Sequence, residues 1–388
     1  MITYLDNAAT TFPKPQGVYD EALRCMTKYC GNPGRSAHSL SLEASKKIFE
    51  CRSLLADLLG VNDIENIIFT LNTTYALNTV IKGLLRSGDH VIISDIEHNA
   101  VFRPIYKLAK NGVIEYDVFS SMATSNKACP TLICAKIASL LRPNTRMVIC
   151  SHASNICSYT LPVKEIGEFC SKRGILFVVD GAQSVGHYPI SVDEMKISAL
   201  CLPSHKGLYG PQGCGVIALG RGVTLETLVE GGNGVNSLDG DMPSFSPERY
   251  EAGTLPTPII AGLCEGIKAV NSYGIDHIRE HEASLFSYAR DKLCNIEGIS
   301  LYLPSYVGST LLFNMNGIPS ETLARELDGH GICSRGGFHC SALAHRTIKT
   351  HPDGAVRVSF GIFNQQRDID TLYKALTTIG KEIPLQTK

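Results

Sequence analysis

The sequence predicts an α/β protein built on a mostly parallel sheet. Short runs rich in Ile, Leu, Val and Phe, bounded by Gly or Asp, are typical of the buried strands of such a sheet. They alternate with longer amphipathic segments at intervals of roughly 25–35 residues, which is the βαβ pattern. With 388 residues, 44% of them hydrophobic and 19% charged, the chain is long enough for one large domain and a smaller one.

Up to residue 219 the expected strands and helices follow one another in regular order. The segment 42–59 has apolar residues at helical spacing and ends at Gly60, a common helix terminator. The polar triplet 72–74 caps the helix expected after it. By the same criteria we expect helices at 16–29, 42–59, 75–85, 102–111, 131–141 and 163–172. Strands are expected at 67–71, 90–95, 146–150, 175–179, 197–203 and 215–219.

Beyond residue 220, two long helices lead into a second region in which strands and helices alternate again. Helices are expected at 258–273, 278–293, 320–329 and 367–379. Strands are expected at 299–303, 309–315, 332–334 and 355–360. Stretches rich in Gly, Pro or polar residues predict an extended arm at 1–15 and loops at 31–36, 120–130 and 231–242.

Composition and charge exclude several classes of function. The 36 basic and 37 acidic side chains leave a formal net charge of −1, so nothing indicates binding to nucleic acid or to an anionic membrane. Because no apolar stretch reaches the roughly 20 residues of a membrane span and the N-terminus lacks a secretory signal, we expect a cytoplasmic protein. The 14 cysteines are scattered without a C-x-x-C pair, which predicts mostly buried, reduced thiols.

Polar side chains follow the predicted strands at the points where these strands end. Because the carboxyl ends of parallel strands lie on one edge of a sheet, we expect these side chains to converge. They belong to Thr73, His98, Asn155, Asp180, Gln183, His205 and Lys206. Taken singly, each type has an ordinary alternative: a helix cap for the threonine, a turn for the aspartate and a solvated charge for the lysine.

The stretch 175–213 combines two of these strand ends in a way that indicates a cofactor. Asp180 closes one buried apolar run, and Lys206 follows the next run, ahead of three closely spaced glycines. Glycines let backbone approach a ligand closely. Pyridoxal 5′-phosphate requires a lysine amine that bonds its aldehyde carbon and a carboxylate that pairs with its pyridine nitrogen. The pair therefore predicts this cofactor.

With these residues assembled, the chain resembles the cysteine desulfurases, as a group II-like member of the class V aminotransferase group of pyridoxal-phosphate enzymes. The resemblance spans essentially the whole chain and rests on YLDNAATT, GNPGRSAH, FTLNTTYALN, the turn at 97–99, VVDGAQS, SHKGLYGPQG, YEAGT and RGGFHC. It implies fold type I, with a large cofactor-binding domain at 16–257 and a smaller C-terminal α+β domain at 258–388. The small domain would carry the cysteine loop, RGGFHC at 335–340. The arm at 1–15 would pack with the small domain.

The resemblance also implies roles for single residues around the cofactor. Lys206 would hold the cofactor and move the α-proton, Asp180 would keep the pyridine nitrogen protonated, and His98 would stack on the ring. Thr254 would reach the phosphate of the neighbouring subunit, which implies a homodimer. The other cofactor contacts implied are Thr73, Thr74, Asn155, Gln183, Ser204 and His205.

In the same family Cys340 is the residue that would receive sulfur. It lies in a Gly-rich loop beside His339 and near Arg335, groups that favour a thiolate. Its sulfur would attack the sulfur of bound L-cysteine, so that L-alanine leaves and a persulfide remains for a sulfur-acceptor protein, in iron–sulfur cluster or thio-cofactor synthesis. Arg357 would clamp the substrate carboxylate, assisted by Arg335 and Asn155.

Alternatives stay open at this level. A selenocysteine lyase or another C–S lyase of the same fold would not need Cys340, and L-selenocysteine would then be the substrate to test. A non-catalytic scaffold on the inherited fold is disfavoured by the intact Lys206, Asp180 and Gln183. No metal is expected, since the spacing of Cys333, His339, Cys340 and His345 matches no zinc motif. The segment 341–345 departs from the family pattern, as do Tyr75 and Ala76, which leaves substrate preference and acceptor open.

Overall fold

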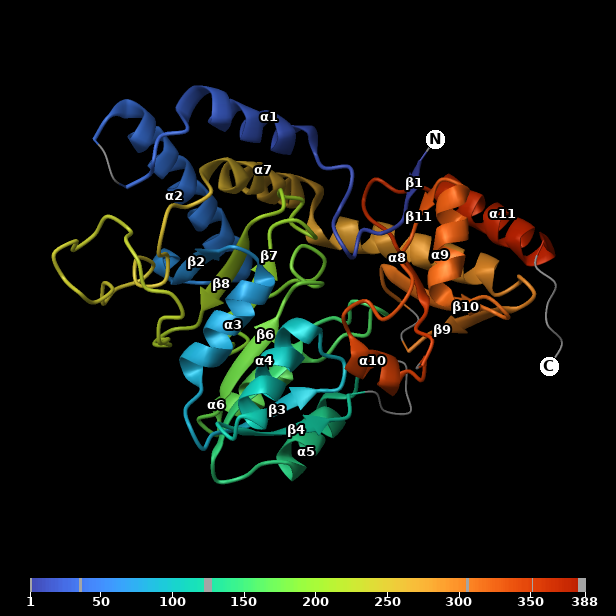
Figure 1. Cartoon of the computed structure of the whole chain (residues 1–388), viewed down its shortest axis with the longest axis horizontal. Helices are drawn as coiled ribbons and strands as arrows, with labels where there is room; N and C mark the ends of the chain where they lie inside the picture. The colour runs from blue at the N-terminus through green and yellow to red at the C-terminus, as the bar shows by residue number, and fades with distance from the viewer. Residues whose placement is uncertain (1, 35–36, 122–127, 305–306, 351, 383–388) are drawn as a thin grey trace.

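A central sheet of seven strands forms the larger part of the molecule (Figure 1). The structure, a computed structural model, describes residues 2–34, 37–121, 128–304, 307–350 and 352–382. The strands of this sheet are β2 (Ile67–Thr70), β3 (His90–Ser94), β4 (Glu115–Phe119), β5 (Thr145–Ser151), β6 (Leu176–Asp180), β7 (Ala199–Pro203) and β8 (Gly215–Leu219). Their order is β2-β8-β7-β6-β5-β3-β4, and only β8 runs antiparallel to its neighbours. The predicted α/β class with a mostly parallel sheet is therefore confirmed.

Helices cover both faces of this sheet. Successive residues of a strand point to opposite faces, so alternate apolar side chains are buried in two separate cores, one on each face. On β5, Val148 and Cys150 share a core with residues of α2, α5, α6 and α7, whereas Met147 and Ile149 share one with residues of α3 and α4. The strands other than β4 are largely buried, as their apolar runs predict. These helices are α2 (Ser39–Leu59), α3 (Thr73–Leu84), α4 (Asn99–Lys110), α5 (Pro130–Ser139), α6 (Val163–Ser171) and α7 (Thr257–Tyr273).

The C-terminal part is built on a second, antiparallel sheet in the order β12-β10-β9. A third core joins this sheet to α8, α9 and α11. These elements are β9 (Ile299–Tyr302), β10 (Thr310–Met315), β12 (Val356–Ser359), α8 (Ile275–Leu293), α9 (Ser320–Gly329) and α11 (Gln366–Glu382). The N-terminal arm lies against this part, because β1 (Thr3–Tyr4) pairs in parallel with β11 (Ile332–Cys333).

The division of the chain at 257/258 stays a prediction. Helix α7 packs on α2 and on α1 (Gln16–Arg24), and its buried side chains share the core of the large sheet. The apolar side chains at the C-terminal end of α8, from Leu285 to Leu293, belong to the core of the small sheet instead. Packing therefore places the change from one core to the other within α8, after the predicted boundary.

Strand β4 and helix α10 (Ala342–Thr347) escaped prediction because neither has an apolar run or a periodic pattern, and the short elements β1 and a 3-10 helix over Ile64–Asn66 were not predicted either. Strand β4 lies at the edge of the sheet and only Phe119 of it is fully buried, so no apolar run marks it. Helix α10 spans only 6 residues, too few for a periodic pattern. The helix expected at 16–29 forms α1 and continues as a π-helix over Cys25–Tyr29. Residues 35–36 of the GNPGRSAH motif and the middle of the loop at 120–130 lie outside the described residues.

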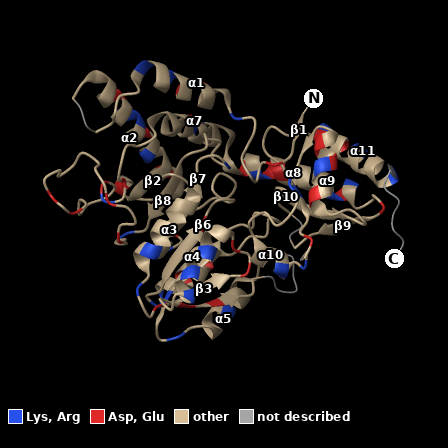
Figure 2. Ribbon diagram, in the orientation of Figure 1, with Lys and Arg blue, Asp and Glu red and all other residues tan. Residues whose placement is uncertain are grey.

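Basic and acidic residues lie along both parts of the molecule (Figure 2), and their formal net charge is −1. Within the part of the chain that the structure describes, no helix is both long and apolar enough to cross a membrane.

Candidate active site

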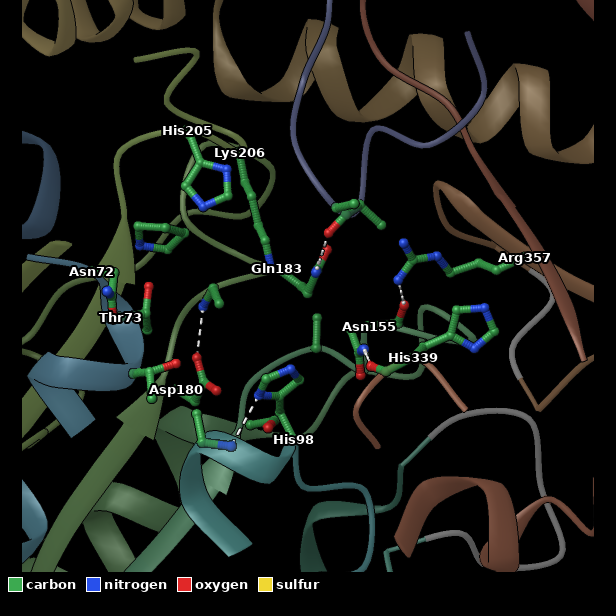
Figure 3. A pocket seen from close by; sticks show the side chains of 18 of the residues that line it. Asn72, Thr73, His98, Asn155, Asp180, Gln183, His205, Lys206, His339 and Arg357 are labelled. Carbon is green, nitrogen blue, oxygen red and sulfur yellow. Dashed lines mark hydrogen bonds between the residues drawn. The ribbon is translucent and has the colours of Figure 1, made fainter. Parts of the chain in front are cut away.

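A cavity of about 230 Å³ lies at the carboxyl edge of the large sheet, between it and the C-terminal part (Figure 3). The strand ends, the N-terminal arm and the C-terminal part all contribute to its lining. Among the predicted site residues it brings together Thr73, Thr74, His98, Asn155, Asp180, Gln183, His205, Lys206, Arg335 and Arg357. The convergence expected from the strand ends is thus present in the structure.

Lys206 and Asp180 reach the cavity from the ends of neighbouring strands, β7 and β6. Burial lowers the pKa of the Lys206 amine to about 8, and the Asp180 carboxylate acts in the opposite direction. The Asp180 carboxyl accepts a hydrogen bond of 3.0 Å from the backbone N–H of Ala182, and burial raises its pKa. The site thus holds an amine that is partly neutral near pH 7 and a buried carboxylate that a cationic group would complement.

One end of the cavity offers unpartnered polar groups to an anion. Thr73 Oγ1 and His205 Nδ1 are buried, and neither has a hydrogen-bond partner among the described residues. Thr73 and Thr74 form the first turn of α3, where backbone N–H groups lack intrahelical partners and the helix dipole is positive. A phosphate group fits these donors.

His98 begins α4 as its N-cap, and its Nδ1 accepts a hydrogen bond of 3.0 Å from the N–H of Ala100. Burial, aided by Lys206 and nearby arginines, lowers the pKa of His98 to about 4. The imidazole is therefore neutral at physiological pH. Its stacking on a cofactor ring stays a prediction.

Gln183 and Asn155 are held by other segments of the chain. The side-chain amide of Gln183 donates to the carbonyl of Ala8 in the arm, over 2.9 Å. Asn155 donates to the carbonyl of His339 over 2.9 Å and accepts from the hydroxyl of Ser341 over 2.6 Å. Both polar atoms of the Asn155 side chain are therefore hydrogen-bonded to residues in or next to the cysteine loop, although Asn155 also lines the cavity.

Arg357 is 1% exposed, and its guanidinium faces the cavity from β12. Its Nη2 donates to Asp6 Oδ1 over 2.6 Å, its Nη1 donates to the carbonyl of Asn155 over 3.0 Å, and its Nε has no partner among the described residues. A carboxylate of the protein itself thus occupies one branch of the predicted carboxylate clamp.

Cys340 is exposed and does not belong to the cavity lining. Arg335, which does, points Nη2 toward its sulfur at 3.8 Å. The preceding residue, His339, is 3% exposed and lines the cavity. The cysteine therefore lies at the rim, next to a cation that belongs to the site.

Two further predicted residues lie elsewhere. Ser204 is fully buried, and its hydroxyl donates to the carbonyl of Pro211 within its own loop. Thr254 is exposed and lines a different cavity, together with residues of α2 and the loop at 231–242. Within one subunit neither residue reaches the cavity, so their phosphate roles stay predictions.

Two residues that the sequence did not single out, and one that it considered only beside Cys340 and for a metal site, also belong to the site or support it. They are Asp6, which pairs with Arg357, His339, and Glu97, a fully buried carboxyl that accepts hydrogen bonds from the N–H and hydroxyl of Ser151 over 2.8 and 3.0 Å. Burial raises the pKa of Glu97 to about 8. Each lies in a quoted motif, but no sequence spacing indicates its distant partner.

Comparison with known proteins supports the resemblance stated above. A family model described as Aminotransferase class-V matches residues 3–372. A probable cysteine desulfurase from Methanothermobacter thermautotrophicus is 34% identical over 385 residues, which cover 97% of this chain and 94% of that protein. A cysteine desulfurase from Yersinia pestis is 32% identical over 390 residues, covering 98% and 94%.

The fold agrees with that of solved relatives. The structure of a cysteine desulfurase from Thermococcus onnurineus NA1, 28% identical, matches with a TM-score of 0.87 over 98% of this chain and 95% of that one. A family model that spans nearly the whole chain and relatives above 30% identity point to the same group. The chain belongs to the class V aminotransferase family.

Proposed function

We propose that the protein is a pyridoxal-phosphate-dependent cysteine desulfurase that converts L-cysteine to L-alanine and leaves the sulfur as a persulfide on Cys340. One observation carries the proposal: a single cavity holds Lys206, Asp180 and Arg357, and Cys340 lies at its rim, 3.8 Å from Arg335. The names of the two relatives described above support the same substrate.

The residues of the cavity fit the cofactor. Lys206 would bond its aldehyde carbon, Asp180 would pair with its pyridine nitrogen, and Thr73 and His205 would contact its phosphate through atoms that have no partner among the residues described. His98, as a neutral imidazole, would lie against the ring. When bound, pyridoxal phosphate supplies a sink for the electron pair released at Cα.

Arg357 and Lys206 would handle the substrate. The Arg357 guanidinium would bind the carboxylate of L-cysteine, for which it offers a buried Nε without a partner among the described residues. Because the pKa of Lys206 is lowered to about 8, part of the amine is neutral near pH 7 and can take the proton from Cα.

Cys340 would perform the sulfur transfer. Its thiolate bonds to the substrate sulfur as the C–S bond of L-cysteine breaks. The electron pair of that bond stays with Cβ, which takes a proton and becomes the methyl group of L-alanine. Carbon is reduced and sulfur is oxidised by the same two electrons, so the step needs no outside oxidant.

The exposed position of Cys340 favours transfer of the sulfur to an acceptor protein. As the resemblance to cysteine desulfurases implies, we expect the persulfide to supply iron–sulfur cluster or thio-cofactor synthesis. The exposed Thr254 agrees with a homodimer in which it serves the neighbouring cavity.

The test is to incubate the purified, cofactor-loaded protein with L-cysteine and to quantify L-alanine. Wild type and a Cys294→Ala control, which removes another exposed thiol, should form alanine, whereas Cys340→Ala should not. Equal alanine from Cys340→Ala would contradict the persulfide mechanism and favour a C–S lyase. Turnover of L-selenocysteine alone would identify a selenocysteine lyase.

A further inference from the structure

The loop that presents Cys340 has an unfavourable backbone conformation. His339 has φ = 51° and Cys340 has φ = 57°, so two consecutive residues with side chains lie in the left-handed region. Such residues cost conformational energy and persist only where surrounding contacts hold them. Two hydrogen bonds to backbone carbonyls of the loop stabilise this conformation. The carbonyl of His339 accepts from the side-chain amide of Asn155, and the carbonyl of Cys340 accepts from the backbone N–H of Asn99 over 2.7 Å.

The rest of the hold comes from a hydrogen-bonded chain that runs from the backbone carbonyl of Arg335 through two buried histidines to Thr350, which follows α10. His339 Nε2 lies 2.9 Å from the carbonyl of Arg335, and His339 Nδ1 lies 3.1 Å from His345 Nε2. His345 Nδ1 lies 2.5 Å from the hydroxyl of Thr350. The two imidazole planes differ by only 13°, which suits an in-plane N–H···N bond. We name this chain, Thr350–His345–His339–Arg335, the imidazole relay.

The chemistry of its ends fixes the direction of every hydrogen bond in the relay. The carbonyl of Arg335 only accepts, so His339 Nε2 carries a proton, and in the neutral ring His339 Nδ1 is an acceptor. His345 Nε2 must therefore donate to it, which leaves His345 Nδ1 to accept from the hydroxyl of Thr350. An additional proton on His339 Nδ1 would oppose the N–H of His345 and break the relay, whereas one on His345 Nδ1 would turn the hydroxyl proton of Thr350 toward the carbonyl of His345, 3.2 Å away.

The surroundings keep both rings neutral. His339 is 3% exposed and His345 is fully buried. Burial lowers the pKa of His339 to about 2 and that of His345 to about 4. The charged groups that act on the rings are the guanidinium groups of Arg357, on both, and of Arg335, on His339, and both oppose a further positive charge.

At its other end the relay meets the backbone of Arg357, the residue proposed to bind the substrate carboxylate. The carbonyl of Arg335 accepts from the backbone N–H of Arg357 over 2.8 Å, as well as from His339. The backbone that carries both arginines is therefore tied to the residue that precedes Cys340. His345 lies in the segment 341–345, which departs from the family pattern, and the cofactor and substrate roles proposed above do not use it.

We propose that His345 is a positioning residue for sulfur transfer: through His339 it holds the left-handed loop that presents the Cys340 sulfur beside Arg335. The kinetic consequence rests on the proposed function, whereas the effect on the loop does not. Replacing His345 removes the donor to His339 and leaves His339 Nδ1 buried without a partner, so the loop loses its hold on one side.

Three variants test the proposal. His345→Leu removes both polar nitrogens at similar bulk. His345→Gln keeps an N–H donor where Nε2 stood. Thr350→Val removes only the hydroxyl at the far end. Two quantities are measured on each: steady-state alanine formation from L-cysteine, and hydrogen–deuterium exchange of the peptide that spans 336–345, with the β5 peptide as internal control.

His345→Leu should lower kcat about tenfold with little change in KM, because the nucleophile is misplaced while the cavity is intact. Its loop peptide should exchange faster and its β5 peptide should not. His345→Gln should restore most of kcat and of the protection. Wild-type kcat and exchange in His345→Leu, or equal losses in His345→Leu and His345→Gln, would overturn the proposal.

The design separates this inference from the proposed function. If wild type forms no alanine, the proposed function fails, while exchange in the three variants still decides whether the relay holds the loop. If His345→Leu does not fold, Thr350→Val replaces it. Faster loop exchange in Thr350→Val, with an unchanged β5 peptide, would support the relay, and wild-type exchange would overturn it.

Discussion

The ion pair between Asp6 and Arg357 determines what the proposed carboxylate-binding guanidinium presents to a ligand. The two residues are 351 positions apart, and their side chains meet at 2.6 Å with Arg357 almost fully buried. A buried guanidinium needs a counter-charge or hydrogen bonds to offset its desolvation. Asp6 provides this charge, but it is also the same chemical group as the carboxylate of the proposed substrate. If Arg357 binds the substrate as proposed, Asp6 competes with the substrate for its guanidinium.

Replacing Asp6 with Asn should lower KM for L-cysteine several-fold, because the competing charge is gone. The same change should reduce the free energy of unfolding by about 3 kcal/mol, since Arg357 loses its counter-charge. Steady-state kinetics and urea unfolding measure the two effects. Asp20→Asn, on the exposed side of α1, is the matched control. An unchanged or higher KM in Asp6→Asn would contradict the competition.

The Lys206 amine should titrate far below an ordinary lysine. In cofactor-free protein, pH-dependent acylation followed by peptide mass spectrometry should give Lys206 a midpoint near its lowered pKa of about 8. The Asp180 carboxylate stabilises the charged amine, so Asp180→Asn should lower this midpoint further. A midpoint near 10.5, the ordinary lysine value, would show that the amine is not desolvated.

Among single residues, the sequence predicts membership of the site for those that directly follow a strand of the sheet. Thr73, His98, Asp180 and Lys206 follow strands of one sheet, and parallel strands bring their ends to one edge. Asp6 and the imidazole relay follow from no such rule. Their partners come from the arm, β12 and a short helix, and only the tertiary structure brings these together.

Among the elements, the turn after β7 shows why its glycines are required. From the sequence alone, these glycines are expected to let the backbone approach a ligand closely. In the structure a Cβ on Gly207 would lie 2.2 Å from the carbonyl of Val185, and one on Gly210 would lie 2.9 Å from the carbonyl of Ser204. The backbone of the turn that carries Lys206 therefore packs directly against the backbone at Val185 and against the backbone of the same turn at Ser204.

Gly207→Ala should accordingly displace this turn, because the added methyl group meets backbone that cannot move aside. We expect a loss of about 2–4 kcal/mol in the free energy of unfolding, together with weaker cofactor retention. Thermal unfolding and cofactor absorbance measure both. Gly240→Ala, where a Cβ meets nothing within 4 Å, is the control. Wild-type stability in Gly207→Ala would show that the backbone there yields.

The order of the elements was predictable because the apolar runs of a parallel sheet buried on both faces are unambiguous. Strand β8 was expected at 215–219 and forms there, and α9 has the expected bounds. Strand β4 was not predictable, since an edge strand with exposed Glu115 and Val118 has no apolar run. The pairing of β1 with β11 also follows from no local pattern, because it joins the two ends of the chain.

The whole molecule has features that a single subunit does not explain. Thr254 is exposed and lies away from the cavity that its proposed phosphate role requires. Several large apolar side chains are also exposed, among them Leu71 at 61%, Leu238 at 105% and Phe245 at 47%. Single exposed apolar side chains are common on protein surfaces. The position of Thr254 is therefore the feature that favours the homodimer proposed above.

Mixed subunits test the homodimer directly. Lys206→Ala should form no alanine, and Thr254→Ala should hold the cofactor weakly. If Thr254 serves the neighbouring cavity, a mixed dimer contains one site with Lys206 from one subunit and Thr254 from the other. Refolding the two variants together should therefore restore activity at low cofactor concentration. No gain over Thr254→Ala alone, or a monomer by light scattering, would contradict the shared site.

The central proposal is that Cys340 receives the sulfur of L-cysteine. Its most direct test is mass spectrometry of the peptide that carries Cys340 after the cofactor-loaded protein reacts briefly with L-cysteine and is alkylated. We predict that this peptide gains the mass of one sulfur atom, in step with the first equivalent of L-alanine. The peptides that carry Cys294 and Cys30, which are also exposed, should not gain it. Alanine formed without added sulfur on Cys340 would contradict the proposal.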